Sequence, residues 1–123
     1  MRAKAARDPK SILYIEDDRD TRDMVSMILA GAKYAVTACE SYADGLKSVK
    51  HSRFGLYIVD HTLPDGHGVD LCKEIRRLDS RTLIIFCSDD EHQNAALESG
   101  VQAFLPKPFG PDDLLALIQK IHD

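Results

Sequence analysis

The feature that most constrains the fold of this sequence is a regular alternation of short apolar runs with longer segments of helical period. Five runs rich in β-branched and aliphatic residues are separated by segments in which apolar residues recur every three or four positions. This alternation is typical of repeated βα units. It predicts an α/β domain built on a parallel sheet.

The elements that this pattern predicts are five strands and five helices. The strands are Ser11–Ile15, Tyr34–Cys39, Gly55–Val59, Thr82–Cys87 and Gln102–Leu105. The helices span about Arg19–Ala30, Tyr42–Lys50, Val69–Leu78, Glu91–Glu98 and Pro111–Ile121. Central strands need not alternate, because a parallel sheet is covered on both faces. Gly31 suits the C-terminus of the first helix, and Gly110-Pro111 followed by two aspartates marks the start of the last.

Size and composition limit the function classes. The chain has 123 residues, 44% of them apolar, which suits one domain with a single core, and we predict a flexible tail over 1–10 and a domain over 11–123. A net charge of −4 without a Lys/Arg cluster argues against direct nucleic-acid binding. The basic N-terminus leads into an apolar run that Glu16 interrupts, so neither a signal peptide nor a membrane span is expected.

The cysteine pattern argues against a disulfide framework or a zinc site. Cys39, Cys72 and Cys87 are an odd number, lie far apart and form no C-x-x-C pair. We expect buried, reduced thiols and a cytoplasmic location.

Polar side chains gather where the predicted strands end. They are Glu16, Asp17, Asp18, Asp60, Ser88 and Lys107. Parallel sheets bind ligands beyond the C-terminal ends of their strands, so these groups should form one site. Crowded carboxylates repel one another unless a hard divalent cation lies among them. Mg²⁺ suits an oxygen-only site and keeps waters that phosphate oxygens can replace, so the pattern indicates phosphoryl chemistry.

Four segments carry a family pattern. They are ILYIEDD at 12–18, IVDHTLPDG at 58–66, IFCS at 85–88 and FLPKPF at 104–109. Together and in this order they resemble the receiver domains of two-component response regulators, over about residues 11–121. The resemblance implies a doubly wound, flavodoxin-like (βα)5 fold with strand order 2-1-3-4-5.

The resemblance also implies a role for each matching acidic residue. Asp60 is the phosphoacceptor, a carboxylate nucleophile. Glu16, Asp17 and Asp60, with the backbone carbonyl of Thr62, hold Mg²⁺. Because Asp18 is also acidic, the acidic pair could be shifted by one residue. Aspartate is a good N-cap residue, so Asp18 is interpreted as the cap of the first helix.

Three further residues match positions that respond to the phosphoryl group. The Ser88 hydroxyl bonds a phosphoryl oxygen, and Lys107 neutralises the same group, with a cis peptide bond between Lys107 and Pro108. Phe104 matches the aromatic switch position, although a core phenylalanine is an equally good interpretation. Leu63-Pro64-Asp65-Gly66 shapes the loop after the third strand, with Gly66 permitting a turn.

One departure from the family is Asp89, because the residue after the matching serine is usually small. Asp89 or Asp90 caps the fourth helix in one interpretation. In the other, the added charge slows attack by anionic donors or steers water or a phosphatase. His61 and His67 lack metal-ligand spacing and are expected to be exposed.

The function implied is a switch that a histidine kinase or a histidine phosphotransfer protein phosphorylates on Asp60. This switch catalyses only its own phosphorylation and dephosphorylation. A downstream protein or a fused output domain would receive the signal, and a homodimer could form through the fourth helix, fifth strand and fifth helix. Two alternatives are a pseudo-receiver that is not phosphorylated and, ranked lower, a Mg²⁺-dependent phosphatase with an aspartyl nucleophile. The phosphatase is disfavoured because Asp60-His61-Thr62 is not D-x-D. The cognate kinase, the pathway and the output are not encoded in these residues.

Overall fold

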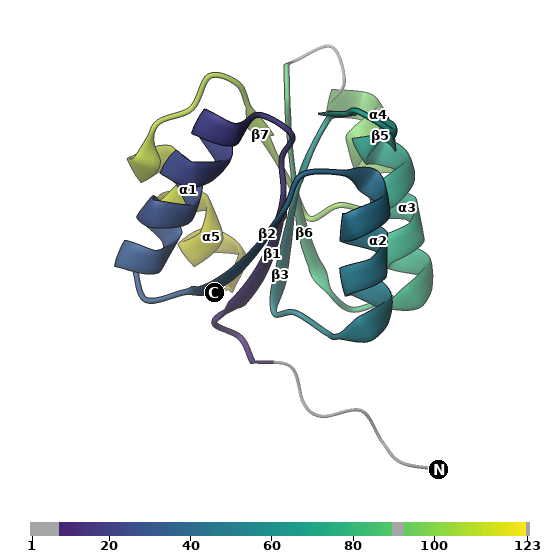
Figure 1. The fold of residues 1–123 in the computed structure, drawn as a ribbon, viewed down its shortest axis with the longest axis horizontal. Coiled ribbons are helices and arrows are strands. Elements are labelled where there is room, and N and C mark those ends of the chain that lie inside the picture. Colours follow the sequence, from purple (N-terminus) through teal and green to yellow (C-terminus); the bar gives the residue numbers. More distant parts are fainter. Residues whose placement is uncertain (1–7, 90–92, 123) are drawn as a thin grey trace.

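Five parallel strands form the central sheet, in the order β2-β1-β3-β6-β7 (Figure 1). They are β1 (Ser11–Ile15), β2 (Ala35–Cys39), β3 (Leu56–Asp60), β6 (Leu83–Ser88) and β7 (Ala103–Pro106). The structure, a computed structural model, describes residues 8–89 and 93–122. Counted along this sheet alone, the order is the 2-1-3-4-5 order of a doubly wound, flavodoxin-like fold, and that prediction is confirmed.

Helices cover both faces of the sheet (Figure 1). The helices α1 (Arg19–Gly31) and α5 (Pro111–His122) lie on one face. On the other lie α2 (Tyr42–His51), α3 (Gly68–Leu78) and α4 (Gln93–Glu98). Within residues 8–89 and 93–122, the structure contains no helix with the length and apolar character needed to cross a membrane.

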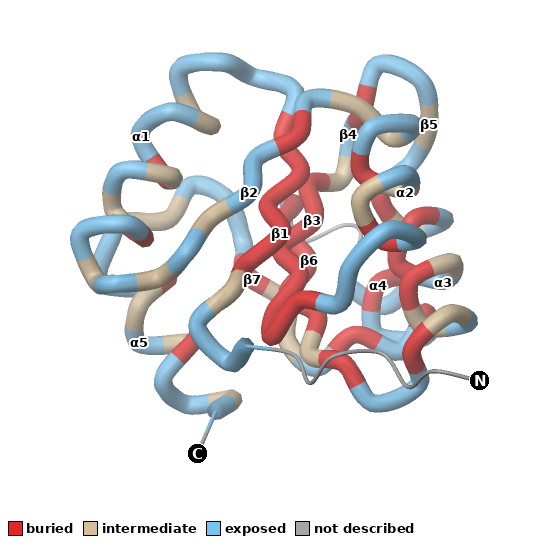
Figure 2. Tube along the Cα trace, turned by 60° about the horizontal axis from the view of Figure 1, so that its bottom comes forward, coloured by how far each residue is buried: buried red, intermediate tan, exposed pale blue. Residues whose placement is uncertain are grey.

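The central strand β3 is buried throughout, and β1 and β6 are buried except at their first residues, Ser11 and Leu83 (Figure 2). Successive residues of a strand point to opposite faces, so the core consists of two clusters, one under each helical layer. Burying apolar surface at roughly 25 cal/mol per Å² is the main force that holds both layers to the sheet. All three cysteines lie in these clusters as free thiols, as predicted.

The third, fourth and fifth strands of the sheet each begin and end one residue later than predicted. Backbone bonds extend the ladders beyond the expected ends: the N–H of His61 donates to the carbonyl of Cys87, and that of Lys107 donates to the carbonyl of Ser88. Asp60 and Ser88 are therefore the last residues of β3 and β6, where strand pairing holds their backbones. Of the predicted tail, residues 1–7 lie outside the described residues, as do positions 91 and 92 of the predicted fourth helix.

The helix α1 ends with a residue in the left-handed backbone conformation, and this residue is not the glycine. Gly31 does lie at the C-terminus of α1, but Lys33 has the positive φ, of 74°. The N–H groups of Ala32 and Lys33 bond to the carbonyls of Ile28 and Ala30. The last carbonyls of α1 are thus satisfied with a lysine in the left-handed conformation, a conformation that glycine adopts most readily.

Candidate functional site

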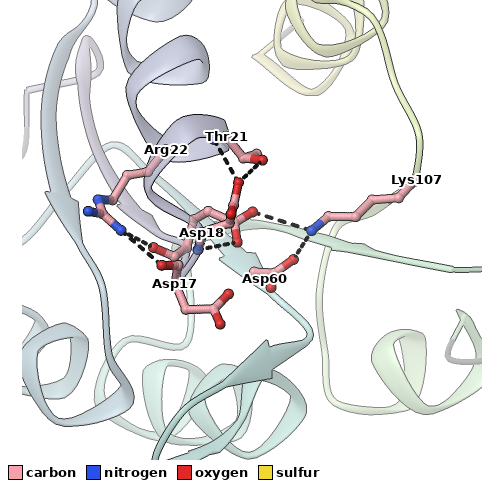
Figure 3. A network of polar contacts seen from close by, with 7 residues as sticks. Asp17, Asp18, Thr21, Arg22, Asp60 and Lys107 are labelled. Carbon is pink, nitrogen blue, oxygen red and sulfur yellow. Dashed lines mark hydrogen bonds and ion pairs between the residues drawn. The ribbon is translucent and has the colours of Figure 1, made fainter.

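The acidic residues predicted at two strand ends come together at one edge of the sheet (Figure 3). The strands β1 and β3 are neighbours with Ile15 opposite Val59, so Glu16 and Asp60 follow at adjacent positions. One carboxylate oxygen from each of Glu16, Asp17 and Asp60 lies within 4.8 Å of the others. Glu16 and Asp60 expose only 2% and 4% of their surface, whereas Asp17 is exposed.

Lys107 reaches this acidic cluster from the loop after β7 (Figure 3). Its Nζ forms an ion pair with Asp60 Oδ1 and lies 3.3 Å from Glu16 Oε1. Burial alone would lower the pKa of Lys107, but the hydrogen bond with Asp60 and the charges of Asp60 and Glu16 outweigh burial and raise it. The Lys107–Pro108 peptide bond is cis, as the resemblance implies. Because the Lys107 N–H also donates to the Ser88 carbonyl, the lysine and the serine are joined through the backbone.

Glu16 is strongly affected by this crowding. Burial, and after it the negative charge of Asp60, raises the pKa of Glu16 to about 7, although Lys107 and the backbone N–H of Asp18 act in the opposite direction. That N–H donates to Glu16 Oε2 at 3.2 Å. Two buried carboxylates facing one ammonium leave an excess of negative charge at the site.

The donor set of the cluster fits Mg²⁺. Its ligand atoms are carboxylate oxygens, and three protein ligands leave positions for the waters that Mg²⁺ retains. Thr62, whose backbone carbonyl is the fourth predicted ligand, lies two residues after Asp60 with its side chain exposed. The roles of these residues stay predictions, while their proximity is a property of the fold.

Two residues at the start of α1 hold the acidic loop (Figure 3). Asp18 is the N-cap of α1, and its Oδ2 accepts the backbone N–H of Thr21 at 2.9 Å and the Thr21 hydroxyl at 2.6 Å. These bonds lower the pKa of Asp18, and the interpretation of this residue as a helix cap is confirmed. Arg22 donates to the backbone carbonyls of Glu16 and Asp17, at 3.0 and 3.2 Å. No motif of the sequence singled out Arg22.

A short hairpin that the sequence pattern did not predict follows β3. Its strands are β4 (Thr62–Leu63) and β5 (Gly66–His67). Asp65, at the turn, accepts the backbone N–H groups of Tyr42 and Ala43 at 2.7 and 3.0 Å and so caps α2 from outside that helix. These bonds lower the pKa of Asp65. Asp65, which the sequence marked only as part of a turn, thus connects the loop after Asp60 to α2.

Glycine is required at position 66 for a different reason from the one expected. The structure gives Gly66 no positive φ, so the turn does not depend on its backbone freedom. A Cβ at this position would instead lie 2.7 Å from Cδ2 of the Tyr42 ring. The close approach of the hairpin to α2 is what excludes a side chain.

Gly68, the first residue of α3, approaches the backbone of Asp60 even more closely. Its N–H donates to the carbonyl of His61 at 2.8 Å. A Cβ on Gly68 would lie 2.0 Å from the Asp60 carbonyl oxygen and 2.9 Å from Cε1 of Phe86. Only glycine therefore lets α3 begin this close to Asp60.

The two proposed switch residues lie on neighbouring strands. Ser88 ends β6 and is 3% exposed. Phe104, on β7, is partly buried, and its ring centroid is 6.3 Å from that of Phe86. This packing is compatible with both interpretations of Phe104. The ring of Phe86 also contacts His61 edge-on at 6.1 Å, so His61 is half-buried and the expectation of an exposed loop histidine is wrong.

Asp89 is exposed directly after Ser88. Asp90, the other candidate cap of the fourth helix, and Glu91 lie outside the described residues. Both interpretations of Asp89 therefore stay open.

The charged groups of the site were predicted from the sequence, whereas Arg22 and Gly68, which hold them in place, were not. Arg22 offered little signal beyond a basic residue one turn after the acidic pair. Gly68 had a stronger one, because it immediately precedes a predicted helix close to Asp60 in sequence. Its role depends on the distance between a helix start and a strand end, which no local pattern reports.

Comparison with known sequences agrees with this geometry. A family profile described as "Response regulator receiver domain" matches residues 12–119. The transcriptional regulatory protein GltR of Pseudomonas aeruginosa is 33% identical over 117 residues, which cover 91% of this chain and 48% of GltR. The response regulator ArlR of Staphylococcus aureus is 31% identical over 112 residues, which cover 89% of this chain and 51% of ArlR. The chain spans about half the length of these curated relatives.

Solved structures share the architecture over nearly their whole length. A CheY-like response regulator receiver domain protein from Methanospirillum hungatei has a TM-score of 0.85 at 28% identity, covering 90% of this chain and 91% of that one. The chemotaxis response regulator CheY4 of Vibrio cholerae has a TM-score of 0.85 at 27% identity, covering 90% and 97%. The BeF3-activated receiver domain of DrrB, a Thermotoga maritima protein, has a TM-score of 0.82 at 28% identity, covering 91% and 96%.

Proposed function

This chain belongs to the response regulator receiver domain family, and we propose that it is a signalling switch in which Asp60 accepts a phosphoryl group in a Mg²⁺-dependent reaction. The observation that carries the proposal is the position of Asp60, buried in a group of three carboxylates and ion-paired with Lys107. The family consists of signalling switches rather than conventional enzymes. The only reactions proposed for this chain are its own phosphorylation and dephosphorylation.

The chemistry divides among the residues of the site. Mg²⁺, held by the three carboxylates and the Thr62 carbonyl, would supply the positive charge that lets an anionic donor approach this acidic cluster. A carboxylate oxygen of Asp60 attacks phosphorus in line, and the bond from phosphorus to the donor nitrogen breaks as the new P–O bond forms. Catalysis then consists mainly of positioning and charge neutralisation.

Lys107 and Ser88 act on the transferred group. Lys107 already lies at Asp60 and remains protonated because its pKa is raised, so its ammonium can pair with a phosphoryl oxygen. Ser88 ends the strand beside β3, and its hydroxyl can donate to a second oxygen. These new contacts exist only in the phosphorylated state, so they can shift the protein between two conformations. We propose Phe104 as the residue that transmits this change to α4, β7 and α5.

The proposed donor is a histidine kinase or a histidine phosphotransfer protein. A pocket of about 360 Å³ opens beside Lys107 and is lined by Thr21, Met24, Lys107, Pro108 and Phe109. Met24 and Met27 on α1 are 52% and 74% exposed. Adaptable apolar side chains on α1, one of which lines the pocket beside Lys107, support contact with a protein donor. Because such donors take their phosphoryl group from ATP, we propose a cytoplasmic location.

The output is proposed to lie outside this chain. GltR and ArlR are about twice as long as the matching region, which supports a fused output domain or a separate downstream protein as the receiver of the signal. A homodimer through α4, β7 and α5 is a further form that the output could take.

The proposal is tested by labelling with a small phosphodonor or a beryllofluoride mimic, with Mg²⁺ and after its chelation. Wild-type protein should be labelled only with Mg²⁺, and Asp60→Asn should abolish labelling. Asp79→Asn is the matched control, because Asp79 is a buried carboxylate at the opposite end of α3 and should not affect labelling. Undiminished labelling of Asp60→Asn would mean a different acceptor. A folded wild type that is inert under all conditions would favour the unphosphorylated pseudo-receiver, which the acidic Asp89 beside Ser88 also favours.

A further inference from the structure

Basic side chains collect at the end of the molecule opposite the acidic site, which is the lower end in Figure 1. In a parallel βα fold, the strands start and the helices finish at this end. The last turns of α2, α3 and α5 carry Lys50, His51, Arg76, Arg77, Lys120 and His122. Just before the strands lie Lys10, Lys33, Arg53 and Arg81. The sequence disperses these residues, and the fold brings them together in a surface that we call the basic end.

This arrangement separates the charges of the chain. The first turns of the helices carry acidic residues at the end where the acidic cluster lies, and these are Asp20, Asp44, Asp70, Asp112 and Asp113. Acidic first turns and basic last turns both suit the helix dipole, so helix stability explains part of the pattern. It does not explain Lys10 and Arg81, which belong to no helix. A chain with a net charge of −4 thus presents a basic surface at one end.

Neighbouring acidic groups offset only part of this positive charge. Among the described residues near the basic end, the acidic ones are Asp8, Glu74, Asp79 and Glu98. The Glu74 carboxylate pairs with Arg77 at 2.7 Å, and that of Asp79 pairs with Arg53 at 3.6 Å. These two acidic groups are therefore already neutralised, and the basic end keeps a positive excess.

A pocket of about 340 Å³ lies within the basic end and is lined by Pro9, Gly55, Arg81, Leu83 and His122. Arg81 and His122 are exposed and make one side of it cationic. Pro9 and the partly buried Leu83 make the other side apolar. Arg81 forms no ion pair with any residue that the structure describes, so its guanidinium can bind a ligand in this pocket.

The wall that Pro9 forms is fixed by a turn. The backbone N–H and the hydroxyl of Ser11 both donate to the carbonyl of Asp8, at 3.0 and 2.6 Å. Gly55 lies against this turn and donates its N–H to Ser11 Oγ at 3.0 Å. A Cβ on Gly55 would lie 2.5 Å from the Asp8 carbonyl oxygen. The pocket is therefore built into the packed fold.

The chemistry of this surface fits an acidic peptide that carries one apolar side chain. Carboxylates complement the exposed cations, and an apolar side chain fills the pocket between them. A single-stranded nucleic acid fits less well, because it needs exposed aromatic rings on which its bases stack. Among the described residues of the basic end, Phe54 and Tyr57 are buried, and Lys10 Nζ covers the ring of Tyr34 at 4.8 Å from its centroid.

We propose that the basic end is a docking surface for an acidic segment of a partner protein, with an apolar side chain of that segment seated in the pocket beside Arg81. A partner bound here leaves Asp60 open to a phosphodonor, because the two surfaces lie at opposite ends of the parallel strands. The inference goes beyond the proposed function and does not depend on phosphorylation.

The test measures the binding of two fluorescent peptides to the full chain by anisotropy, without Mg²⁺ or phosphodonor. The first probe has a leucine between two runs of four glutamates, and the second has serine in place of leucine. The leucine probe should bind at about 0.02 M salt and lose most of its affinity at about 0.3 M, because salt screens exposed charges. The serine probe should bind about fivefold more weakly, because it buries no apolar side chain.

Charge reversal at the two ends of the molecule is the matched comparison. Arg81→Glu should weaken binding of the leucine probe about fivefold, since it replaces an attraction by a repulsion. Arg19→Glu changes the net charge equally at the opposite end, where the Arg19 side chain is 84% exposed, and should keep the affinity within about twofold. Thermal unfolding establishes that both variants fold.

Four results would overturn the proposal. They are no binding of the leucine probe at low salt, equal binding of the two probes, equal losses in the two arginine variants, and tighter binding of a DNA duplex of about 20 base pairs than of the leucine probe. NMR then locates the bound peptide. Amide resonances of residues 9–11, 53–55, 81–83 and 120–122 should shift, and shifts confined to the acidic site would also overturn the proposal.

Discussion

Gly68→Ala should be the most damaging small substitution close to the acidic site. The added Cβ would lie 2.0 Å from the Asp60 carbonyl oxygen, where ordinary contacts begin at 3.4 Å. The strand end carrying Asp60 is held by pairing with β6, and the N–H of Gly68 is bonded to His61. Either α3 or the end of β3 must therefore move by about 1 Å or more.

The magnitude follows from two opposing effects. Overpacking in a well-packed region costs about 1–3 kcal/mol, and a clash of Cβ with backbone belongs at the upper end, since no flexible side chain can yield. Alanine returns up to about 1 kcal/mol of helix propensity at the start of α3. We expect a net loss of about 2–3 kcal/mol, which for a domain of this size lowers the melting temperature by about 10 °C. Phosphorylation should slow as well, because the displaced backbone is that of Asp60.

Urea and thermal unfolding of Gly68→Ala and Gly31→Ala measure this effect. The Gly31 variant is the control, because no atom lies within 4 Å of its added Cβ and its φ is not positive. Alanine there should be neutral or stabilise by up to about 1 kcal/mol. Equal stability of the two variants would refute the argument that space beside Asp60 requires glycine.

Two further effects follow from the structure. In Mg²⁺-free buffer the free energy of unfolding should fall by up to about 3 kcal/mol as the pH rises from 4.5 to about 7. The reason is that the raised pKa of Glu16 in the folded state favours its protonated form, and that contribution to stability is lost when Glu16 ionises. Urea unfolding across this pH range measures the effect, and a flat profile would contradict it. Arg76→Ala should destabilise by about 1–2 kcal/mol, because Arg76 donates twice to the carbonyl of Gly100, at 3.1 and 2.8 Å, where α4 leads into β7. Arg77→Ala, which removes only an exposed pair with Glu74, should change little, and hydrogen exchange around Gly100 should rise in the first variant alone.

Much of the fold and the charged part of the site could be predicted because both follow from local patterns. Apolar runs of five or six residues report strands buried on both faces, and helical period reports the layers that cover them. Once the strands are parallel, the residues that end them share one edge of the sheet. Asp60, Glu16 and Lys107 were therefore placed together before any distance was known.

The residues that hold those charges depend on contacts between distant segments. Asp65 caps α2 across 23 positions of sequence. The requirement for glycine at position 68 is set by the distance from the start of α3 to the end of β3. No period or propensity of a single segment contains that distance.

By itself, the sequence determined the class of fold, the edge of the sheet where chemistry occurs and the charged groups found there, because hydrophobic period and strand direction are local properties. The tertiary structure decided that Arg22 binds the acidic loop, that Asp65 caps α2 and that the His61 ring packs against Phe86. Each of these depends on how side chains from packed elements meet in three dimensions. The physical reason is that packing is set by the register and spacing of elements relative to one another, which individual segments do not encode.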